Sequence, residues 1–413
     1  MLTIEGNIIN INKVFRGRIE INESGIINKI GEPTGGADFI FKDELIFPGF
    51  IDLHVHARED MSYTQDYKED FKTAGEAAIN GGVVAFAEMP NNPVPPIDDE
   101  SYEAKNILAQ KSPVPVTLYA GIGPKTSPLS RKVPYKVFMG PSVGDLFFTS
   151  LLDLEKTIAR YQGQNVSFHC EDPEILEEAS KAGTHESRRP PEAETSAVDF
   201  AIRLIEKYNL TGKVCHCSTL EGMSKIIKAK ARGVRATVEV TPHHLYFDET
   251  MLGENRKSFQ VNQPIRQTKE NRLALIALLK KGDIDYIATD HAPHTIEEKE
   301  KGISGLTHLD TYGSFITWLA NEHKFTGEEI ARVCATNPAD FMNEFLPKES
   351  GKYGKIEEGY VGSLTVINMS KKFKVESKKL KTKCGWSPFE GITFPGSVSM
   401  TIVKGKILKN ETK

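Results

Sequence analysis

The sequence predicts an α/β protein: a (β/α)8 barrel of the TIM type with a small β-sandwich domain formed by the N- and C-terminal segments. Three observations lead to this fold class. The 413 residues leave room for one barrel, which commonly needs about 250 residues, and a small second domain. Short apolar runs alternate with amphipathic stretches through the middle of the chain. Short segments of alternating polarity, separated by turn signals, stand at both ends.

The two chain ends are predicted to form small strands. Residues 2–4 and 18–21 alternate in polarity, and Ser24-Gly25 marks a turn between such segments. The same texture returns in residues 363–367 and 399–403. We therefore predict that residues 1–47 and 355–413 form one small β-domain. Residues 48–354 are then the barrel domain.

The central part of the chain contains eight apolar runs of strand length, which is the number that a closed barrel needs. They are residues 50–54, 83–87, 116–120, 135–139, 166–169, 213–216, 236–240 and 286–290. Amphipathic intervals between them predict helices, for example over residues 153–161, 195–208, 220–232 and 269–281.

Composition excludes several classes of protein. Hydrophobic residues make up 39% and charged residues 26%, as in an ordinary globular chain, and the formal net charge is -4. No excess of lysine and arginine points to nucleic acid or to a membrane surface as a partner, and the basic stretch 371–383 is predicted to be a solvated sheet edge. Five scattered cysteines and the lack of an apolar signal or spanning segment predict a cytoplasmic protein without disulfides.

Six potential metal ligands fall at or near the carboxyl ends of five predicted strands, where active sites of such barrels gather. They are His54, His56, Lys136, His169, His216 and Asp290. A single histidine is as often a hydrogen-bonded core or surface residue. Repetition at one structural position, inside apolar runs, instead indicates a metal centre, because polar side chains there need a partner. Two divalent ions, with zinc the most typical, are expected; cobalt and manganese remain alternatives.

Lys136 is unusual in this set because an ammonium group has no lone pair for a metal. A carbamate formed with CO2 would carry two oxygens and could bridge metals about 3.5–4 Å apart. The alternative is an unmodified lysine in a salt bridge to Asp290 or to substrate. Asp290 is predicted to take a proton from the attacking water and deliver it to the leaving nitrogen; the alternative is a ligand role only.

At these residues the chain resembles the amidohydrolase superfamily, and within it the cyclic amidohydrolases: dihydroorotase, allantoinase, dihydropyrimidinase and hydantoinase. The resemblance spans nearly the whole chain. Its carriers are the segments PGFIDLHVH (48–56), KVFMG (136–140), HCED (169–172), TPHHL (241–245) and DHAPH (290–294). It implies that His54, His56, Asp290 and a carbamylated Lys136 hold one metal, and that Lys136, His169 and His216 hold the other.

The resemblance is strongest to dihydroorotases, whose substrate carries a ring carboxylate and needs a cationic receptor. Arg58 matches the arginine that dihydroorotases have in this motif and could pair with the carboxylate through two hydrogen bonds. The resemblance further implies that Asn91 and His294 help to bind the carboxylate and that Asn262 binds the ring amide. The expected reaction is reversible hydrolysis of L-dihydroorotate to N-carbamoyl-L-aspartate in pyrimidine biosynthesis. Another cyclic amidohydrolase, or a catalytically silent scaffold, are the alternatives.

Some positions depart from the pattern or fall outside it. The segment SGLTH (304–308) stands where dihydroorotases often have PGLET, and Asn92 replaces a common threonine. The sequence therefore does not assign the substrate contacts at the edge of the pocket. His243 and His244 are predicted to order the loop after the seventh strand, and Cys215 and Cys217 to face the helices. Surface or loop roles are expected for His185, His308 and His323. A homo-oligomer or a pyrimidine-pathway enzyme partner are the options for assembly.

Overall fold

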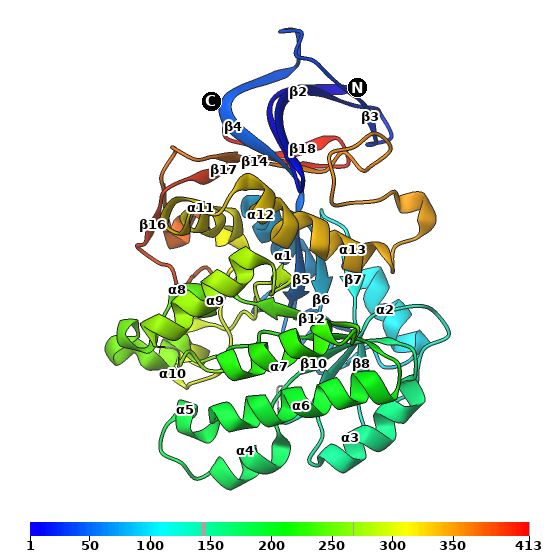
Figure 1. Ribbon diagram of the computed structural model, residues 1–413, viewed down its shortest axis with the longest axis vertical. Helices are drawn as coiled ribbons and strands as arrows, with labels where there is room; N and C mark the ends of the chain where they lie inside the picture. Colours follow the sequence, from blue (N-terminus) through cyan, green and yellow to red (C-terminus); the bar gives the residue numbers. More distant parts are fainter. Residues whose placement is uncertain (142–145, 267, 413) are drawn as a thin grey trace.

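The computed structural model describes residues 1–141, 146–266 and 268–412 and shows a barrel of parallel strands below a separate β-layer (Figure 1). The barrel strands are β5 (Phe50–Val55), β6 (Val83–Glu88), β7 (Val116–Leu118), β8 (Ala120–Ile122), β9 (Tyr135–Phe138), β10 (Asn165–His169), β11 (Thr211–Val214), β12 (Ala236–Val240) and β13 (Tyr286–Ile287). Each of the eight predicted runs overlaps one of these strands, β7 and β8 sharing one run. The predicted fold class is confirmed.

Parallel pairing runs round the barrel in two arcs, β5-β6-β7 and β8-β9-β10-β11-β12-β13. Tyr119 joins the arcs between β7 and β8, and a parallel bridge between Val55 and His291 brings the chain after β13 back to β5. Because all strands are parallel, their carboxyl ends meet at one mouth of the barrel. This arrangement gathers residues from distant parts of the sequence.

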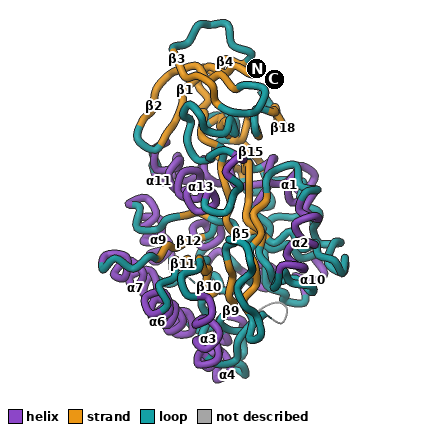
Figure 2. The backbone as a smooth tube through the Cα atoms, turned by 90° about the vertical axis from the view of Figure 1, so that its right-hand side faces the viewer, coloured by secondary structure: helices purple, strands orange, loops and turns teal. Residues whose placement is uncertain are grey.

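Helices surround the barrel on its outer face (Figures 1 and 2). They are α1 (Phe71–Asn80), α2 (Asp99–Ala109), α3 (Leu151–Ile158), α4 (Pro173–Ala179), α5 (His185–Arg188), α6 (Pro191–Lys207), α7 (Leu220–Ala231), α8 (Pro242–Tyr246), α9 (Lys269–Lys281), α10 (Ile296–Glu300), α11 (Tyr312–His323), α12 (Gly327–Ala331) and α13 (Asn337–Asn343). Helices occupy all four predicted intervals. None of the described helices is long and apolar enough to cross a membrane.

Local capping explains where these helices begin and end. In α9 the Thr268 hydroxyl accepts the Asn271 N–H, and Gly282 ends the helix with a φ of 92°. Both residues are typical of these positions, so the sequence predicts this helix well. Helix α6 begins four residues before the predicted start, because Pro191 fits the first helical position and Glu192 and Glu194 favour the first turn.

The β-layer combines both ends of the chain in one seven-stranded sheet of order β18-β17-β14-β4-β1-β2-β3. Its strands are β1 (Leu2–Asn10), β2 (Lys13–Ile21), β3 (Ile27–Gly31), β4 (Phe39–Pro48), β14 (Leu364–Asn368), β17 (Ser397–Val403) and β18 (Lys406–Asn410). Strand β4 from the N-terminal part pairs with β14 from the C-terminal part, and Figure 2 shows the termini together in this layer. Strands β15 (Phe373–Lys374) and β16 (Thr393–Phe394) form a separate two-stranded sheet that is not hydrogen-bonded to the seven-stranded one. The domain boundaries near residues 47 and 355 stay predictions.

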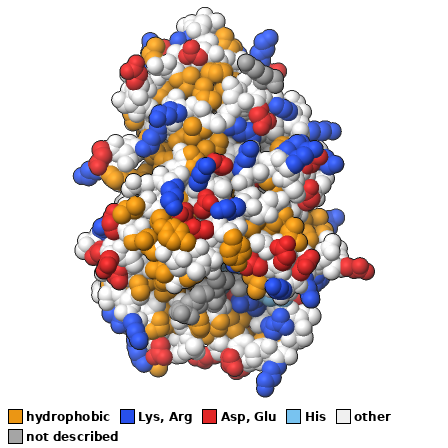
Figure 3. Space-filling model, turned by 180° about the vertical axis from the view of Figure 1, so that it is seen from behind, with side chains coloured by type: hydrophobic (Ala, Val, Ile, Leu, Met, Phe, Trp, Pro, Cys, Tyr) orange, Lys and Arg blue, Asp and Glu red, His pale blue; other side chains and the backbone are white. Residues whose placement is uncertain are grey.

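Two apolar cores hold this architecture together. The larger lies inside and around the barrel, and the smaller, which includes Ile4, Ile46 and Met400, fills the β-layer. On the face drawn in Figure 3, acidic and basic side chains are interspersed. That mixture accords with the small net charge.

Candidate metal centre

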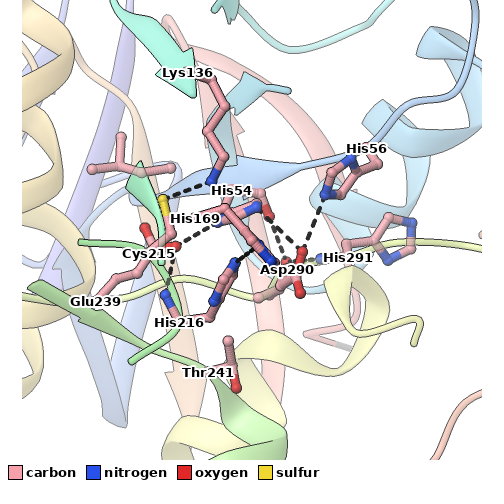
Figure 4. A network of polar contacts seen from close by, with 12 residues as sticks. His54, His56, Lys136, His169, Cys215, His216, Glu239, Thr241, Asp290 and His291 are labelled. Carbon is pink, nitrogen blue, oxygen red and sulfur yellow. Dashed lines mark hydrogen bonds and ion pairs between the residues drawn. The ribbon is translucent and has the colours of Figure 1, made fainter. Parts of the chain in front are cut away.

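His54, His56 and Asp290 converge at the mouth of the barrel (Figure 4). His54 Nε2 lies 3.2 Å and His56 Nε2 lies 3.1 Å from the same oxygen, Asp290 Oδ1. The three ligand atoms are all within 4.8 Å of one another, and all three residues are buried. Two of them come from the end of β5 and the third follows β13, more than 230 residues later. Two nitrogens and a carboxylate oxygen so placed suit one divalent ion.

His169 and His216 form a second, adjoining pair at the ends of β10 and β11. His169 Nδ1 lies 3.0 Å from His216 Nε2, and the centroid of the His216 ring is 5.2 Å from that of His54. His169 Nε2 lies 2.8 Å from Glu171 Oε2, and Arg189 pairs with the same carboxylate. Glu171 therefore sets the tautomer in which His169 Nδ1 carries the lone pair toward His216.

Lys136 projects from β9 toward these histidines and is fully buried (Figure 4). Its Nζ lies 2.8 Å from Cys215 Sγ. Within the part of the chain that the structure describes, the ion pairs include none between Lys136 and Asp290, which was one of the two unmodified alternatives; the other, a pair with a substrate group, stays open. Its location therefore suits the bridging role that we expect after carbamylation.

The prediction that Cys215 faces the helices is wrong, whereas Cys217 does contact α6 through Glu194, with Sγ 3.1 Å from Oε1. Strand β11 ends at Val214, and His216 has a φ of 33°. Lys213, two residues earlier, is buried inside the barrel, so alternation along the strand turns Cys215 inward as well. The left-handed backbone of His216 breaks that alternation, so His216 also faces the site instead of the helices.

Three of the seven described non-glycine residues with left-handed backbone lie at the candidate site. Arg58, His216 and Asp290 have φ values of 62°, 33° and 48°, in a region that residues other than glycine rarely adopt. Thr289, next to Asp290, donates its backbone N–H to Asp52 Oδ1 at 3.0 Å, which ties this segment to β5. Strained backbone held by such contacts is typical of functional sites.

Burial sets the charge states that fit a cation. It lowers the pKa values of His54, His56 and His216 well below the ordinary value, so these imidazoles are neutral and keep lone pairs. Burial raises the pKa of Asp290 to about 8, because a carboxylate there has lost its water. His216 Nδ1 is buried without a hydrogen-bond partner. Neutral nitrogens around a desolvated carboxyl group form a donor set that a divalent ion would complete.

Glu239 is the main functional residue that sequence reasoning missed. It is fully buried on β12, its carboxylate contacts His54 Nδ1 and Lys213 Nζ, and its Oε1 accepts the His216 N–H at 3.2 Å. Such a partner orients a ligating imidazole and fixes its Nε2 as the free lone pair. Potential metal-ligand atoms of Cys215, Glu239 and His54 also lie within 4.8 Å of one another. The signal was present, since Glu239 is an acidic residue inside an apolar strand run.

The pocket beside these ligands is lined by three of the four predicted substrate residues, Arg58, Asn91 and Asn262. Its lining is His54, His56, Arg58, Asn91, Phe138, His169, His216, Asn262, Asp290, Ala292, Ser304 and Gly305. Arg58 is only 2% exposed. Asn91 Oδ1 and Asn262 Oδ1 are buried without hydrogen-bond partners, as expected of acceptors that a ligand would satisfy. His294 lies behind Arg58, with Nε2 3.1 Å from an Arg58 terminal nitrogen.

The predictions for the remaining histidines hold in part. His244 Nε2 lies 3.0 Å from the Gln263 carbonyl oxygen, so it orders the loop after β12 as predicted. His308 lies in a loop, one of its two predicted places, but it is buried there because its ring stacks on His243 with Nε2 3.0 Å from His243 Nδ1. His185 is half-buried and contacts the Val261 carbonyl, and His323 is at the end of α11.

Comparisons with known proteins agree with this geometry. A family model described as "Amidohydrolase family" matches residues 45–133 and 143–408. The chain is 32% identical to a dihydroorotase of Methanosphaera stadtmanae over 99% of its length and 95% of the relative's. It is 33% identical to a dihydroorotase of Thermococcus kodakarensis, over 98% of this chain and 94% of that one.

Solved structures support the fold. An L-hydantoinase (dihydropyrimidinase) from Arthrobacter aurescens superimposes with a TM-score of 0.89 at 22% identity, covering 100% of this chain and 96% of that one. A D-hydantoinase from Thermus sp. gives a TM-score of 0.83 at 22% identity, with the same coverage. At such identities the likeness concerns the barrel with its β-sandwich and leaves the substrate open.

Proposed function

We propose that this chain, which belongs to the amidohydrolase family, is a dihydroorotase that reversibly hydrolyses L-dihydroorotate to N-carbamoyl-L-aspartate in pyrimidine biosynthesis. The buried Arg58 in the pocket carries the proposal. Hydantoins and dihydropyrimidines have no ring carboxylate, whereas dihydroorotate has one. A guanidinium group withdrawn from water and turned toward a metal-type site is a costly feature that an anionic substrate explains.

The pocket residues are assigned to two different groups of the substrate. We assign Arg58, Asn91 and His294 to the carboxylate and Asn262 to the ring amide. Arg58 can form two parallel hydrogen bonds to a carboxylate, which fixes the orientation of the ring as well as its position. The reacting carbonyl is thereby held next to His54, His56 and Asp290, and restricted motion of the bound ring lowers the barrier.

Asp290 is the group to which we assign proton transfer. Its carboxylate takes the proton from the water that attacks the carbonyl carbon, and then gives it to the amide nitrogen as the ring C–N bond breaks. His54, His56, Lys136, His169, His216 and Asp290 would hold two divalent ions, with zinc the first choice and a carbamate on Lys136. When bound, these ions supply electrophilic assistance to the carbonyl and acidify water.

Comparison of substrates on one preparation tests the proposal. We expect metal-loaded protein to turn over L-dihydroorotate at least about 100-fold more efficiently than dihydrouracil or allantoin, because only dihydroorotate has a charge for Arg58. A clear preference for either uncharged ring refutes the assignment in favour of another cyclic amidohydrolase. No turnover of any of them by protein with two bound metals would favour a silent scaffold.

Arg58→Met separates charge recognition from the chemistry. The loss of two charge-assisted hydrogen bonds should lower kcat/KM for dihydroorotate by about 100-fold or more. Arg203→Gln, at an exposed position of α6, is the matched control and should leave it unchanged. Intact-mass measurement should show a CO2 adduct that Lys136→Ala abolishes. Its absence from active wild-type protein would contradict the carbamate.

A further inference from the structure

His294 lies between the substrate arginine and a group of donors on the far side. Its Nε2 is 3.1 Å from a terminal nitrogen of Arg58, and Arg58 Nε donates to the Pro293 carbonyl at 3.3 Å. Its Nδ1 is 3.2 Å from Glu298 Oε2 and 3.3 Å from Lys68 Nζ. Burial, with the charges of Arg58 and Lys68, lowers the pKa of His294 to about 2, so the ring is neutral and one nitrogen carries hydrogen.

Glu298 accepts hydrogen bonds from donors in two segments, residues 67–68 and residues 294–295. Its Oε1 accepts from the Tyr67 hydroxyl at 2.7 Å and pairs with Lys68 Nζ at 2.9 Å. Its Oε2 accepts the Thr295 N–H at 3.1 Å, the first-turn contact of α10, and faces His294 Nδ1. Burial opposes ionisation, yet the hydrogen bonds from Tyr67 and Lys68 lower the pKa of Glu298 to about 2. An ionised carboxylate only accepts, so it requires hydrogen on His294 Nδ1.

The opposite tautomer fails on the same distances. With hydrogen on Nε2, that N–H would face the Arg58 guanidinium, which has donors only. Nδ1 would then be a lone pair 3.2 Å from the Glu298 carboxylate, with only the Lys68 ammonium, 3.3 Å away, as a donor. The contact with Arg58 would place two donors against each other and the contact with Glu298 two acceptors, so both of these hydrogen bonds would be lost. With hydrogen on Nδ1, both contacts become hydrogen bonds, and Lys68 is satisfied by Glu298.

We infer that Glu298 is a positioning residue for substrate recognition: it fixes His294 as an acceptor at Nε2, and His294 in turn orients the Arg58 guanidinium for the substrate carboxylate. This inference rests on the proposed function. It also refines the role of His294, because a ring with a lone pair at Nε2 serves the carboxylate through Arg58. Tyr67 and Lys68 support the arrangement by holding Glu298.

The test compares Glu298→Gln with Glu297→Gln, the neighbouring acid on the same helix; among the described residues, no hydrogen bond or ion pair joins Glu297 to His294. Glutamine keeps the first-turn contact of α10, so the helix is retained. Its single oxygen and its NH2 group cannot serve all four donors. We expect Glu298→Gln to raise KM for dihydroorotate and the dissociation constant of orotate by about 10-fold, with kcat within about 2-fold. Glu297→Gln should match wild type in all three.

Two further measurements separate this role from a structural one. Tyr67→Phe, at a position 56% exposed, removes one of the four donors and should raise KM by about 2- to 3-fold. In protein labelled with 15N-histidine, the His294 ring, identified by its loss in His294→Gln, should show the Nδ1–H tautomer. Observation of the Nε2–H tautomer would overturn the inference.

The outcomes distinguish this inference from the proposed function. If wild type prefers dihydroorotate but Glu298→Gln and Tyr67→Phe keep the wild-type KM and orotate affinity, the positioning role is wrong and the function stands. If wild type turns over dihydrouracil as well as dihydroorotate, the proposed function itself fails. An equal loss in Glu297→Gln would mean that the charge of α10 matters rather than the contact with His294.

Discussion

Removal of the Glu239 charge should lower both the stability of the fold and the affinity for metal, because the buried carboxylate contributes to each. Glu239 and Lys213 form an ion pair whose side chains are 0% and 1% exposed, and Glu239 also contacts His54 Nδ1. Glu239→Gln leaves the Lys213 ammonium buried without its counter-charge, which costs about 3–5 kcal/mol. The loss of the charged partner of His54 should weaken metal binding by about 10- to 100-fold.

The stability term converts into a shift of the melting temperature. An unfolding entropy of about 2.1 cal/mol/K per residue gives about 0.9 kcal/mol/K for a chain of this length, so Tm should fall by about 3–6 °C. Calorimetry on metal-free protein measures this fall without a contribution from metal binding. Competition with a chromophoric chelator measures metal affinity separately.

A double variant and a matched pair make the reasoning refutable. Glu239→Gln with Lys213→Met removes both buried charges, so Tm should recover to within about 2 °C of wild type while metal binding stays weak. Glu88→Gln breaks another buried pair, with Lys105 at 2.6 Å, and should lower Tm with metal affinity within about 2-fold of wild type. Full recovery of metal affinity in the double variant, or an equal loss in Glu88→Gln, would show that Glu239 does not act through His54.

Three other outcomes follow from the structure. Exhaustive chelation should abolish activity and lower Tm, and zinc should restore both; activity that survives chelation would contradict the metal centre. Burial lowers the pKa of Lys299 to about 7, so between about pH 7 and 10.5 the unfolded chain binds the extra proton and stability rises with pH. Lys299→Met should flatten that rise in a Tm series, and an unchanged slope would refute the assignment. Gly81→Ala would set a Cβ 1.8 Å from the Leu309 carbonyl oxygen and should cost about 1–3 kcal/mol in a denaturant titration, whereas Gly183→Ala, with open space around it, should be neutral.

The sequence by itself determined the barrel and the residue types at its mouth. The signals were local: apolar runs of strand length, amphipathic intervals between them, and helix caps such as Thr268 and Gly282. Local signals depend only on neighbouring residues, so they can be recognised in the sequence. His54 and His56 were placed together because β5 is extended up to Val55. The ligand set could be assembled because parallel strands bring their carboxyl ends to one edge.

Only the tertiary structure decided which side chains meet beyond that edge. His216 faces the site together with Cys215 because its left-handed backbone breaks the alternation of the strand, and His308 is buried because it stacks on His243, 65 positions away. Glu239 and Glu298 acquire their roles from partners about 185 and 230 residues earlier in the chain, His54 and Tyr67. Hydrogen bonds and charges act over a few ångströms, and which groups come that close depends on how the loops and strand ends pack, which no local pattern records.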